Sequence, residues 1–338
     1  MCDALLVNEA REWWTSWLGV DALGPVPWRF GPERPAAAPL DPRWTEQEVA
    51  LGHPGDELTC VIVRPERGGT VRRPAVLVPF YDVAPVLGRP SRRRSGGRGE
   101  LAFAAPLVEA GFVVMAVPWW FEAVVGDDAP ADLDARYGPG AARHAARSGS
   151  TALGRSVRDV MAAVDVLQAL GDVDPLGIGA LGHSLGGKLV LFTSALDPRI
   201  AAAVAHEPGV GLGHSNWSAP WYLGEHAPRD RDLDEVLGLV APRPFLLVGG
   251  GASDGAHNRD VVERASERWG AGGGLDVLLH GGGHPVPAHV LAACVAWLAG
   301  RLDAPGRAEG PGARRDERPV PTLPGTSSTT AGGRGCHA

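Results

Sequence analysis

The sequence predicts an α/β protein with a mostly parallel central sheet that is flanked by helices on both faces. Short apolar runs, typical of strands that are buried on both sides, alternate along the chain with amphipathic segments of helical period. Strands that alternate with helices indicate βαβ crossovers, which place the strands parallel in one sheet. The 338 residues are enough for one large domain of this kind.

The first elements are less regular than the rest. Residues 1–45 are rich in Trp and Pro, and Trp13, Trp14 and Trp17 fall on adjacent turns of a short helix. We expect these residues to form an N-terminal extension packed on the core. An extended pair follows at Trp44–Leu51 and Glu57–Arg64, and the intervening Pro54-Gly55-Asp56 has the composition of a turn.

The remaining elements form the alternating core, which we assign to one domain of residues 46–302. The predicted strands are Pro74–Phe80, Phe112–Val117, Ile178–Leu181, Ile200–Ala205, Phe245–Val248 and Leu275–Leu279. The predicted helices are Leu101–Ala110, 151–170, Leu185–Leu196 and Ala288–Leu302. Beyond Leu302 the chain has no aromatic residue and is mostly Gly, Pro, Arg, Ser and Thr. Because such a segment cannot bury enough apolar surface to offset its ordering entropy, we expect residues 303–338 to be disordered.

Charge and composition exclude several classes of function. With 32 Lys and Arg against 39 Asp and Glu, the net charge of −7 argues against a nucleic-acid binder. No apolar run is long enough to span a membrane, and the start lacks the basic and apolar regions of a secretory signal. The four cysteines are scattered without metal-ligand spacing. We therefore expect a cytoplasmic protein without a membrane, metal or cofactor partner; the oligomeric state stays open.

The strongest motif is Gly182-His183-Ser184-Leu185-Gly186, which lies between a predicted strand and a predicted helix. A strand that turns sharply into a helix forces Ser184 into a strained conformation and lifts its hydroxyl clear of the sheet. Glycines at both ends of the motif allow so tight a turn. This context predicts a nucleophilic serine, with a Gly-rich turn and an incidental serine as the alternative.

A serine hydroxyl needs a base, and the base needs an orienting carboxylate. His284 follows the strand Leu275–Leu279 in a Gly-rich loop and is the predicted base, preferred over His280 and His289. Asp254 follows the strand Phe245–Val248 and is the predicted acid. Its rivals are Asp260, which we interpret as a cap or surface charge, and Glu207, which directly follows another strand and could also reach the histidine.

Backbone amides and aromatic side chains complete the predicted site. The amide of Leu185, and that of Tyr81 after the strand Pro74–Phe80, are the expected oxyanion donors. Aromatic residues with a polar neighbour could line a substrate pocket or could simply cover the sheet; they are Trp119, Asn216, Trp217, Trp221 and Tyr222. The basic run Arg89–Arg98 is interpreted as a solvated loop, with attraction of an acidic substrate as the alternative.

These residues resemble the α/β-hydrolase superfamily, and within it the dienelactone hydrolase and acetylxylan esterase group of serine esterases. The resemblance covers about residues 40–300 and rests on RPAVLVPFYD, GHSLGGK, LDPRIAAAV and the NWSAPWYLG segment. It implies a Ser-His-acid esterase without a metal or an organic cofactor, in which Ser184, Asp254 and His284 occupy the catalytic positions. The Arg-rich insertion near residues 89–98 departs from the pattern of the group.

The predicted function is hydrolysis of a carboxylic ester, with small acyl or acetyl esters of small molecules as the expected substrates. A peptidase, a thioesterase or a lactonase of the same fold would use the same residues. A protein of another class, a non-catalytic ligand-binding relative, would keep the aromatic residues but hold the serine, histidine and acid apart.

Overall fold

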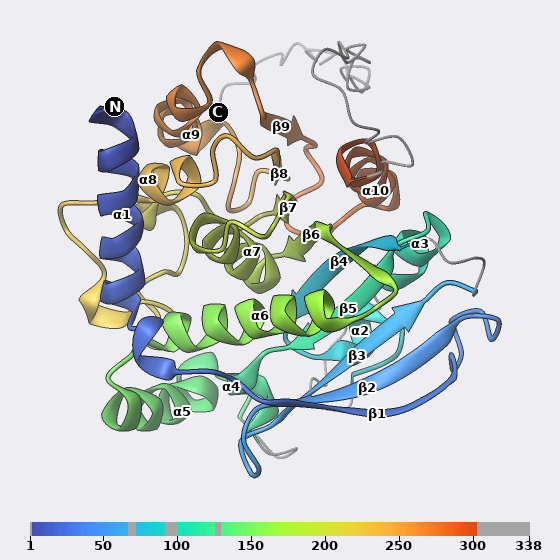
Figure 1. Cartoon of the computed structure of the whole chain (residues 1–338). Helices are drawn as coiled ribbons and strands as arrows, with labels where there is room; N and C mark the ends of the chain where they lie inside the picture. Colours follow the sequence, from blue (N-terminus) through green and yellow to red (C-terminus); the bar gives the residue numbers. More distant parts are fainter. Residues whose placement is uncertain (1, 67–71, 92–100, 126–129, 303–338) are drawn as a thin grey trace, which may run out of the picture. The chain divides into compact units, whose positions relative to one another are not determined.

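The computed structural model describes residues 2–66, 72–91, 101–125 and 130–302 (Figure 1). Within these residues nine strands form one sheet in the order β1-β2-β3-β5-β4-β6-β7-β8-β9. The strands are β1 (Trp28–Pro35), β2 (Thr45–Leu51), β3 (Leu58–Arg64), β4 (Arg73–Phe80), β5 (Val113–Pro118), β6 (Val173–His183), β7 (Ala202–His206), β8 (Phe245–Gly249) and β9 (Leu275–Leu279).

The sheet has an antiparallel and a parallel part. β1, β2, β3 and β5 pair antiparallel in turn, whereas every neighbouring pair from β5 through β4 to β9 is parallel. Parallel strands end at the same edge of a sheet, so the loops after β4, β6, β7, β8 and β9 gather there. This edge is where the predicted site residues lie.

Helices cover both faces of the sheet. One face packs on α1 (Cys2–Leu18), α5 (Leu133–Ser148), α6 (Ala152–Ala169), α7 (Leu185–Leu196), α8 (Leu233–Gly238) and α9 (Arg259–Ser266). The other packs on α2 (Val83–Val86), α3 (Ala104–Glu109) and α10 (Ala288–Leu302). The short α4 (Trp120–Ala123) follows β5. Figure 1 shows α6 and α7 on the opposite side of the sheet from α3 and α10. Two hydrophobic cores, one beneath each helical layer, hold the three layers together.

The predicted fold class is confirmed, and several elements are additional, among them β1 and α5. The helix expected at Trp13–Trp17 is the much longer α1, and the N-terminal segment also supplies β1 at the sheet edge. Helix α5 was not predicted because Gly138, Pro139 and Gly140 interrupt its sequence. Residues 303–338, and positions 92–98 of the basic run, lie outside the described residues.

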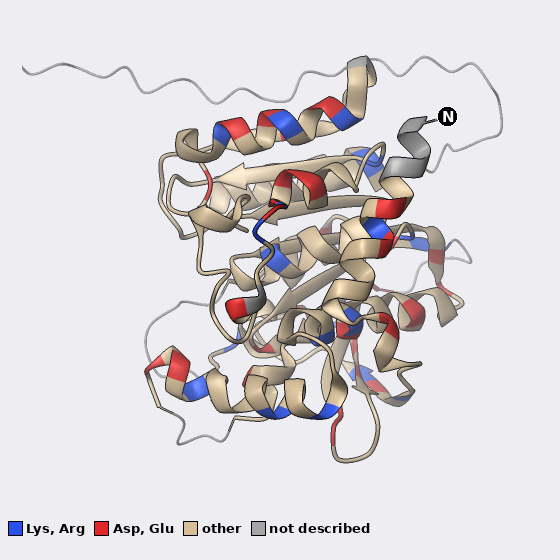
Figure 2. Cartoon of the chain, turned by 90° about the vertical axis from the view of Figure 1, so that its left-hand side faces the viewer, with Lys and Arg blue, Asp and Glu red and all other residues tan. Residues whose placement is uncertain are grey.

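The described surface carries both signs of charge. Figure 2 shows acidic and basic residues interleaved along the helices on that side of the described chain. Among the described residues no helix has the length and apolarity needed to cross a bilayer. Cys60 and Cys294 are buried thiols, as expected for small core residues, and burial raises the pKa of both.

Candidate active site

Ser184 occupies a strained turn between β6 and α7. Its φ of 56° and ψ of −115° lie where side chains other than glycine are rare. The two flanking glycines are required by close backbone approach: a Cβ on Gly182 would lie 2.1 Å from the carbonyl oxygen of Gly186. A Cβ on Gly186 would lie 2.1 Å from the carbonyl oxygen of Pro79. The motif therefore folds as a sharp strand–turn–helix that presents the serine at the carboxyl edge of the sheet.

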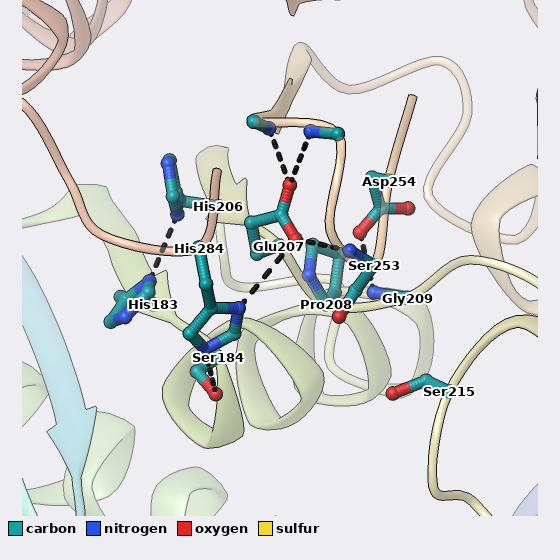
Figure 3. A network of polar contacts seen from close by, with 12 residues as sticks. His183, Ser184, His206, Glu207, Pro208, Gly209, Ser215, Ser253, Asp254 and His284 are labelled. Carbon is teal, nitrogen blue, oxygen red and sulfur yellow. Dashed lines mark hydrogen bonds and ion pairs between the residues drawn. The ribbon is translucent and has the colours of Figure 1, made fainter. Parts of the chain in front are cut away.

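His284 faces this serine from the loop after β9 (Figure 3). Its Nε2 lies 2.9 Å from Oγ of Ser184, and its side chain is about one-third exposed. Backbone hydrogen bonds fix the loop: the amide of His280 donates to Gly249, and that of Gly283 donates to Gly250, each at 2.9 Å. The imidazole is thus held within hydrogen-bond distance of the hydroxyl and remains accessible from solvent.

Glu207 lies behind His284, directly after β7. Its Oε2 is 3.6 Å from Nδ1 of His284, and the side chain is almost completely buried. The carboxylate accepts hydrogen bonds from the amides of Gly250, Gly251 and Ser253 (Figure 3). Its backbone φ of 54° is also strained.

These contacts determine the ionisation of Glu207. Burial alone would raise its pKa, but the nearby His284 imidazole and the hydrogen bonds from the amides of Ser253 and Gly250 outweigh it. They lower the pKa of Glu207 to about 2. The group is therefore an anion at neutral pH, and it can orient and stabilise a charged imidazole.

Asp254, the predicted acid, is hydrogen-bonded to groups other than His284. Its carboxylate accepts hydrogen bonds from the amides of Gly209 and Val210, at 2.5 and 2.8 Å, and from the Asn258 side chain at 2.7 Å. No contact joins it to His284 within the part of the chain that the structure describes. Burial raises its pKa. Both acids follow strands that end at one edge, but only Glu207 comes close to the imidazole. The geometry therefore favours Glu207 over Asp254 as the acid.

The other rivals are placed away from the serine. Asp260 pairs with Arg264 on the surface of α9, and His289 is exposed within α10. His280 is hydrogen-bonded to His206 through the two Nε2 atoms at 2.8 Å.

The expected oxyanion donors lie in the two segments that meet at the serine turn. Leu185 is the first residue of α7, so no helix carbonyl is available to its amide. Tyr81 follows β4, whose end lies against the serine turn, since a Cβ on Gly186 would lie only 2.1 Å from the carbonyl oxygen of Pro79. Their role stays a prediction, which this proximity supports.

The aromatic residues are mostly interior. Trp119, Trp217, Trp221 and Tyr222 are each at most 5% exposed and belong to one core cluster, while Asn216 is exposed. The Trp217 indole donates to the carbonyl of Gly209 at 2.7 Å, which ties the loop after β7 to the core. This burial favours the alternative that the rings cover the sheet, and substrate contact by them stays a prediction.

Lys188, the single lysine of the chain, was not singled out from the sequence as a site residue. It is buried on α7, where its ammonium donates to the carbonyl of Pro208 and to Oγ of Ser215, each at 2.7 Å. Nζ also lies 3.8 Å from the centre of the Trp217 ring. Lys188 therefore fixes the segment that directly follows Glu207. Its position four residues after the serine, in a chain otherwise without lysine, is the signal that could have identified it.

The fold is that of the α/β-hydrolases. Residues 100–220 of the chain match the dienelactone hydrolase family, so the resemblance expected from the sequence is confirmed. A curated relative, YtaP of Bacillus subtilis (strain 168), named as a hydrolase, is 31% identical over 109 residues. That alignment covers 30% of this chain and 36% of the relative, so the chain aligns with about a third of the relative's length.

Solved structures agree with the fold. A glucuronoyl esterase from Teredinibacter turnerae has a TM-score of 0.60 and 18% identity, over 83% of this chain and 80% of its own. A candidate acetyl xylan esterase from Bacteroides fragilis has a TM-score of 0.58 and 16% identity, over 81% of this chain and 74% of its own. At these identities the likeness shows the shared α/β-hydrolase fold.

Proposed function

We propose that this protein is a serine hydrolase that cleaves carboxylic esters through an acyl-enzyme. The observation that carries the proposal is the alignment of Ser184 Oγ, the His284 imidazole and the Glu207 carboxylate in one hydrogen-bonded and ion-paired row. A hydroxyl, a base within 3 Å and an ionised acid behind it are the parts that nucleophilic catalysis by serine requires.

In the first half-reaction, His284 Nε2 takes the proton from Ser184 as Oγ attacks the ester carbonyl carbon. The amides of Leu185 and Tyr81 face the oxyanion of the tetrahedral intermediate. The C–O bond to the alcohol then breaks, and His284 returns the proton to the departing alkoxide. Glu207 stays ionised throughout, because its pKa is about 2, and stabilises the imidazolium.

In the second half-reaction, a water molecule replaces the alcohol. His284 removes a proton from the water as the water oxygen attacks the acyl carbon. The bond between that carbon and Oγ of Ser184 then breaks, His284 returns the proton to Oγ, and the carboxylic acid is released. The same groups serve both half-reactions, so His284 has to accept a proton from the attacking oxygen and return it to the leaving oxygen from one position.

Small-molecule esters, including esters of carbohydrates, are the proposed substrates, with acetyl esters preferred. The family match and the names of the structural neighbours, glucuronoyl esterase and acetyl xylan esterase, support this class.

The test compares hydrolysis of 4-nitrophenyl acetate, a longer acyl ester, a lactone, a thioester, a peptide and a methyl ester of a sugar uronate. Wild-type protein should hydrolyse at least one oxygen ester, and Ser184→Ala should lose almost all of that turnover while its thermal unfolding changes little. Full activity in Ser184→Ala would reject the mechanism. Turnover confined to the thioester or the peptide would reject ester hydrolysis, and binding without turnover of any substrate would support the ligand-binding alternative.

A further inference from the structure

Three further histidines lie beside the proposed triad, one in each segment that carries a triad residue. His183 directly precedes Ser184, His206 directly precedes Glu207, and His280 starts the loop that ends in His284. The three rings are joined in one chain. Nδ1 of His183 lies 2.9 Å from Nδ1 of His206 (Figure 3), and Nε2 of His206 lies 2.8 Å from Nε2 of His280.

The positions of the protons in this chain follow from counting. Each nitrogen–nitrogen contact needs one proton, on one side only. The amide of Gly282 is shared between the His280 carbonyl oxygen and Nδ1 of His280, the latter at 3.2 Å, so that nitrogen is an acceptor and a neutral His280 carries its proton on Nε2. His280 then donates to His206, which must carry its own proton on Nδ1 and donate to His183. His183 accepts at Nδ1, and its proton is therefore on Nε2.

Burial disfavours a charge on His206 and His280. The side chains of His183 and His206 are 4% and 3% exposed. Burial, together with the neighbouring His280 and His284, lowers the pKa of His206 to about 4, against the opposing charge of Glu207. The pKa of His280 is also lowered, first by burial and then by His289, again against Glu207. A proton added to His206 would put two N–H groups against each other at one of its two contacts.

This chain of histidines contacts the catalytic imidazole of His284 directly. The ring centres of His183 and His284 are 4.8 Å apart, and those of His206 and His280 are 5.1 Å apart with their planes 23° from parallel, as an edge-to-edge hydrogen bond requires. Gly250 leaves room for this packing, because a Cβ there would lie 2.9 Å from the His280 ring and 1.8 Å from the Gly283 carbonyl oxygen. The three rings do not form a metal site: within the described residues, no three His, Cys, Asp or Glu side chains are grouped as metal ligands.

We propose that His280, His206 and His183 form a neutral, one-directional hydrogen-bonded chain that positions the serine, the acid and the base relative to one another. This proposal rests on the proposed function, since the chain has a role only if the triad is used. The three are positioning residues: they touch neither substrate nor the reacting oxygen in the proposed mechanism. The side-chain contacts tie the loop of His284 to the ends of β7 and β6, and its backbone hydrogen bonds tie it to the end of β8.

The first test removes one link and then restores it. His280→Leu leaves Nε2 of His206 without its donor, whereas the side-chain amide of His280→Gln can supply an N–H at the same place. We expect kcat to fall about tenfold or more in the leucine variant with little change in KM, because misplacement of catalytic groups lowers the rate after binding. The glutamine variant should recover most of kcat. His53→Leu, at an exposed histidine in the turn between β2 and β3, is the matched control and should behave as wild type.

The second test reads the protons without using activity. Nitrogen-15 NMR of histidine-labelled protein at pH 7 should show neutral rings protonated on Nε2 in His280, on Nδ1 in His206 and on Nε2 in His183. Protonation of His206 on Nε2, or a doubly protonated His206, would overturn the proposal. So would unchanged kcat in His280→Leu, or equal losses in the leucine and glutamine variants. If the wild type proves inactive on esters but the NMR pattern is as expected, the proposed function fails while the hydrogen-bonded chain of the three histidines is confirmed.

Discussion

Replacement of Glu207 by glutamine should abolish most of the activity while the same change at Asp254 should not. At a separation of 3.6 Å, an ionised Glu207 stabilises the His284 imidazolium by about 4–5 kcal/mol at an effective dielectric constant of about 20. A loss of this size in the transition state corresponds to a fall in kcat of about a thousandfold. Asp254 has no contact with His284 in the described structure, and Asp254→Asn should keep kcat within about tenfold of wild type.

The two variants are matched in their effect on stability. Each carboxylate is 1% exposed and accepts hydrogen bonds from three N–H donors, so an amide in its place sets an NH₂ group against at least one donor. Each change should therefore cost about 1–3 kcal/mol in the free energy of unfolding.

The assay is hydrolysis of 4-nitrophenyl acetate, normalised to the folded fraction from urea unfolding of the same samples. A loss of kcat in Asp254→Asn equal to or larger than that in Glu207→Gln, at equal folded fraction, would refute the assignment of Glu207.

Two further predictions concern the turn and the buried lysine. Gly186→Ala should lower the free energy of unfolding by about 3 kcal/mol, or prevent folding, because its Cβ would meet the Pro79 carbonyl oxygen. Gly138→Ala, inside α5 where a Cβ meets open space, is the control and should not destabilise the protein. Urea unfolding that ranks the two variants in the opposite order would contradict the packing described. Burial lowers the pKa of Lys188 from 10.5 to about 7, so between these values the unfolded chain binds more protons than the native one. The contribution of Lys188 therefore makes stability rise with pH from about 7 to 10.5, and Lys188→Met should flatten that rise in unfolding curves measured across the range. An unchanged slope would show that the buried amine does not titrate in this window.

The sequence alone predicted the serine turn, because the residues that form it are neighbours in the chain. The serine turn combines a strand, two glycines and a helix within a few residues, and the backbone crowding at Gly182 and Gly186 explains why those letters are needed. The base could be chosen because its Gly-rich loop follows a strand of a parallel sheet, whose ends share one edge.

The choice of acid could not be made from the sequence, since Glu207 and Asp254 both follow strands that end at that edge. It depends on the strained φ of Glu207 and on where the loop after β8 folds back, and neither property is visible in a linear pattern. The same holds for the histidine chain, whose members are separated by 23 and 74 positions and meet only in the folded sheet.

Strand β1 and helix α5 were missed because tertiary packing overrides local preference. β1 contains a glycine and two prolines, which an edge strand tolerates because one side of its ladder is unpaired. α5 continues through Pro139 and buries Tyr137, Ala141 and His144 against the neighbouring elements.

Covalent labelling with a fluorophosphonate, followed by mass spectrometry of the digested protein, tests the central claim most directly. An activated hydroxyl at position 184 should take up one phosphonyl group per chain, on the peptide that contains Ser184. Labelling should be at least a hundredfold slower in His284→Ala, because general-base assistance contributes about that much or more. Absence of labelling at Ser184 in folded protein, or equal labelling rates with and without the imidazole, would contradict the account.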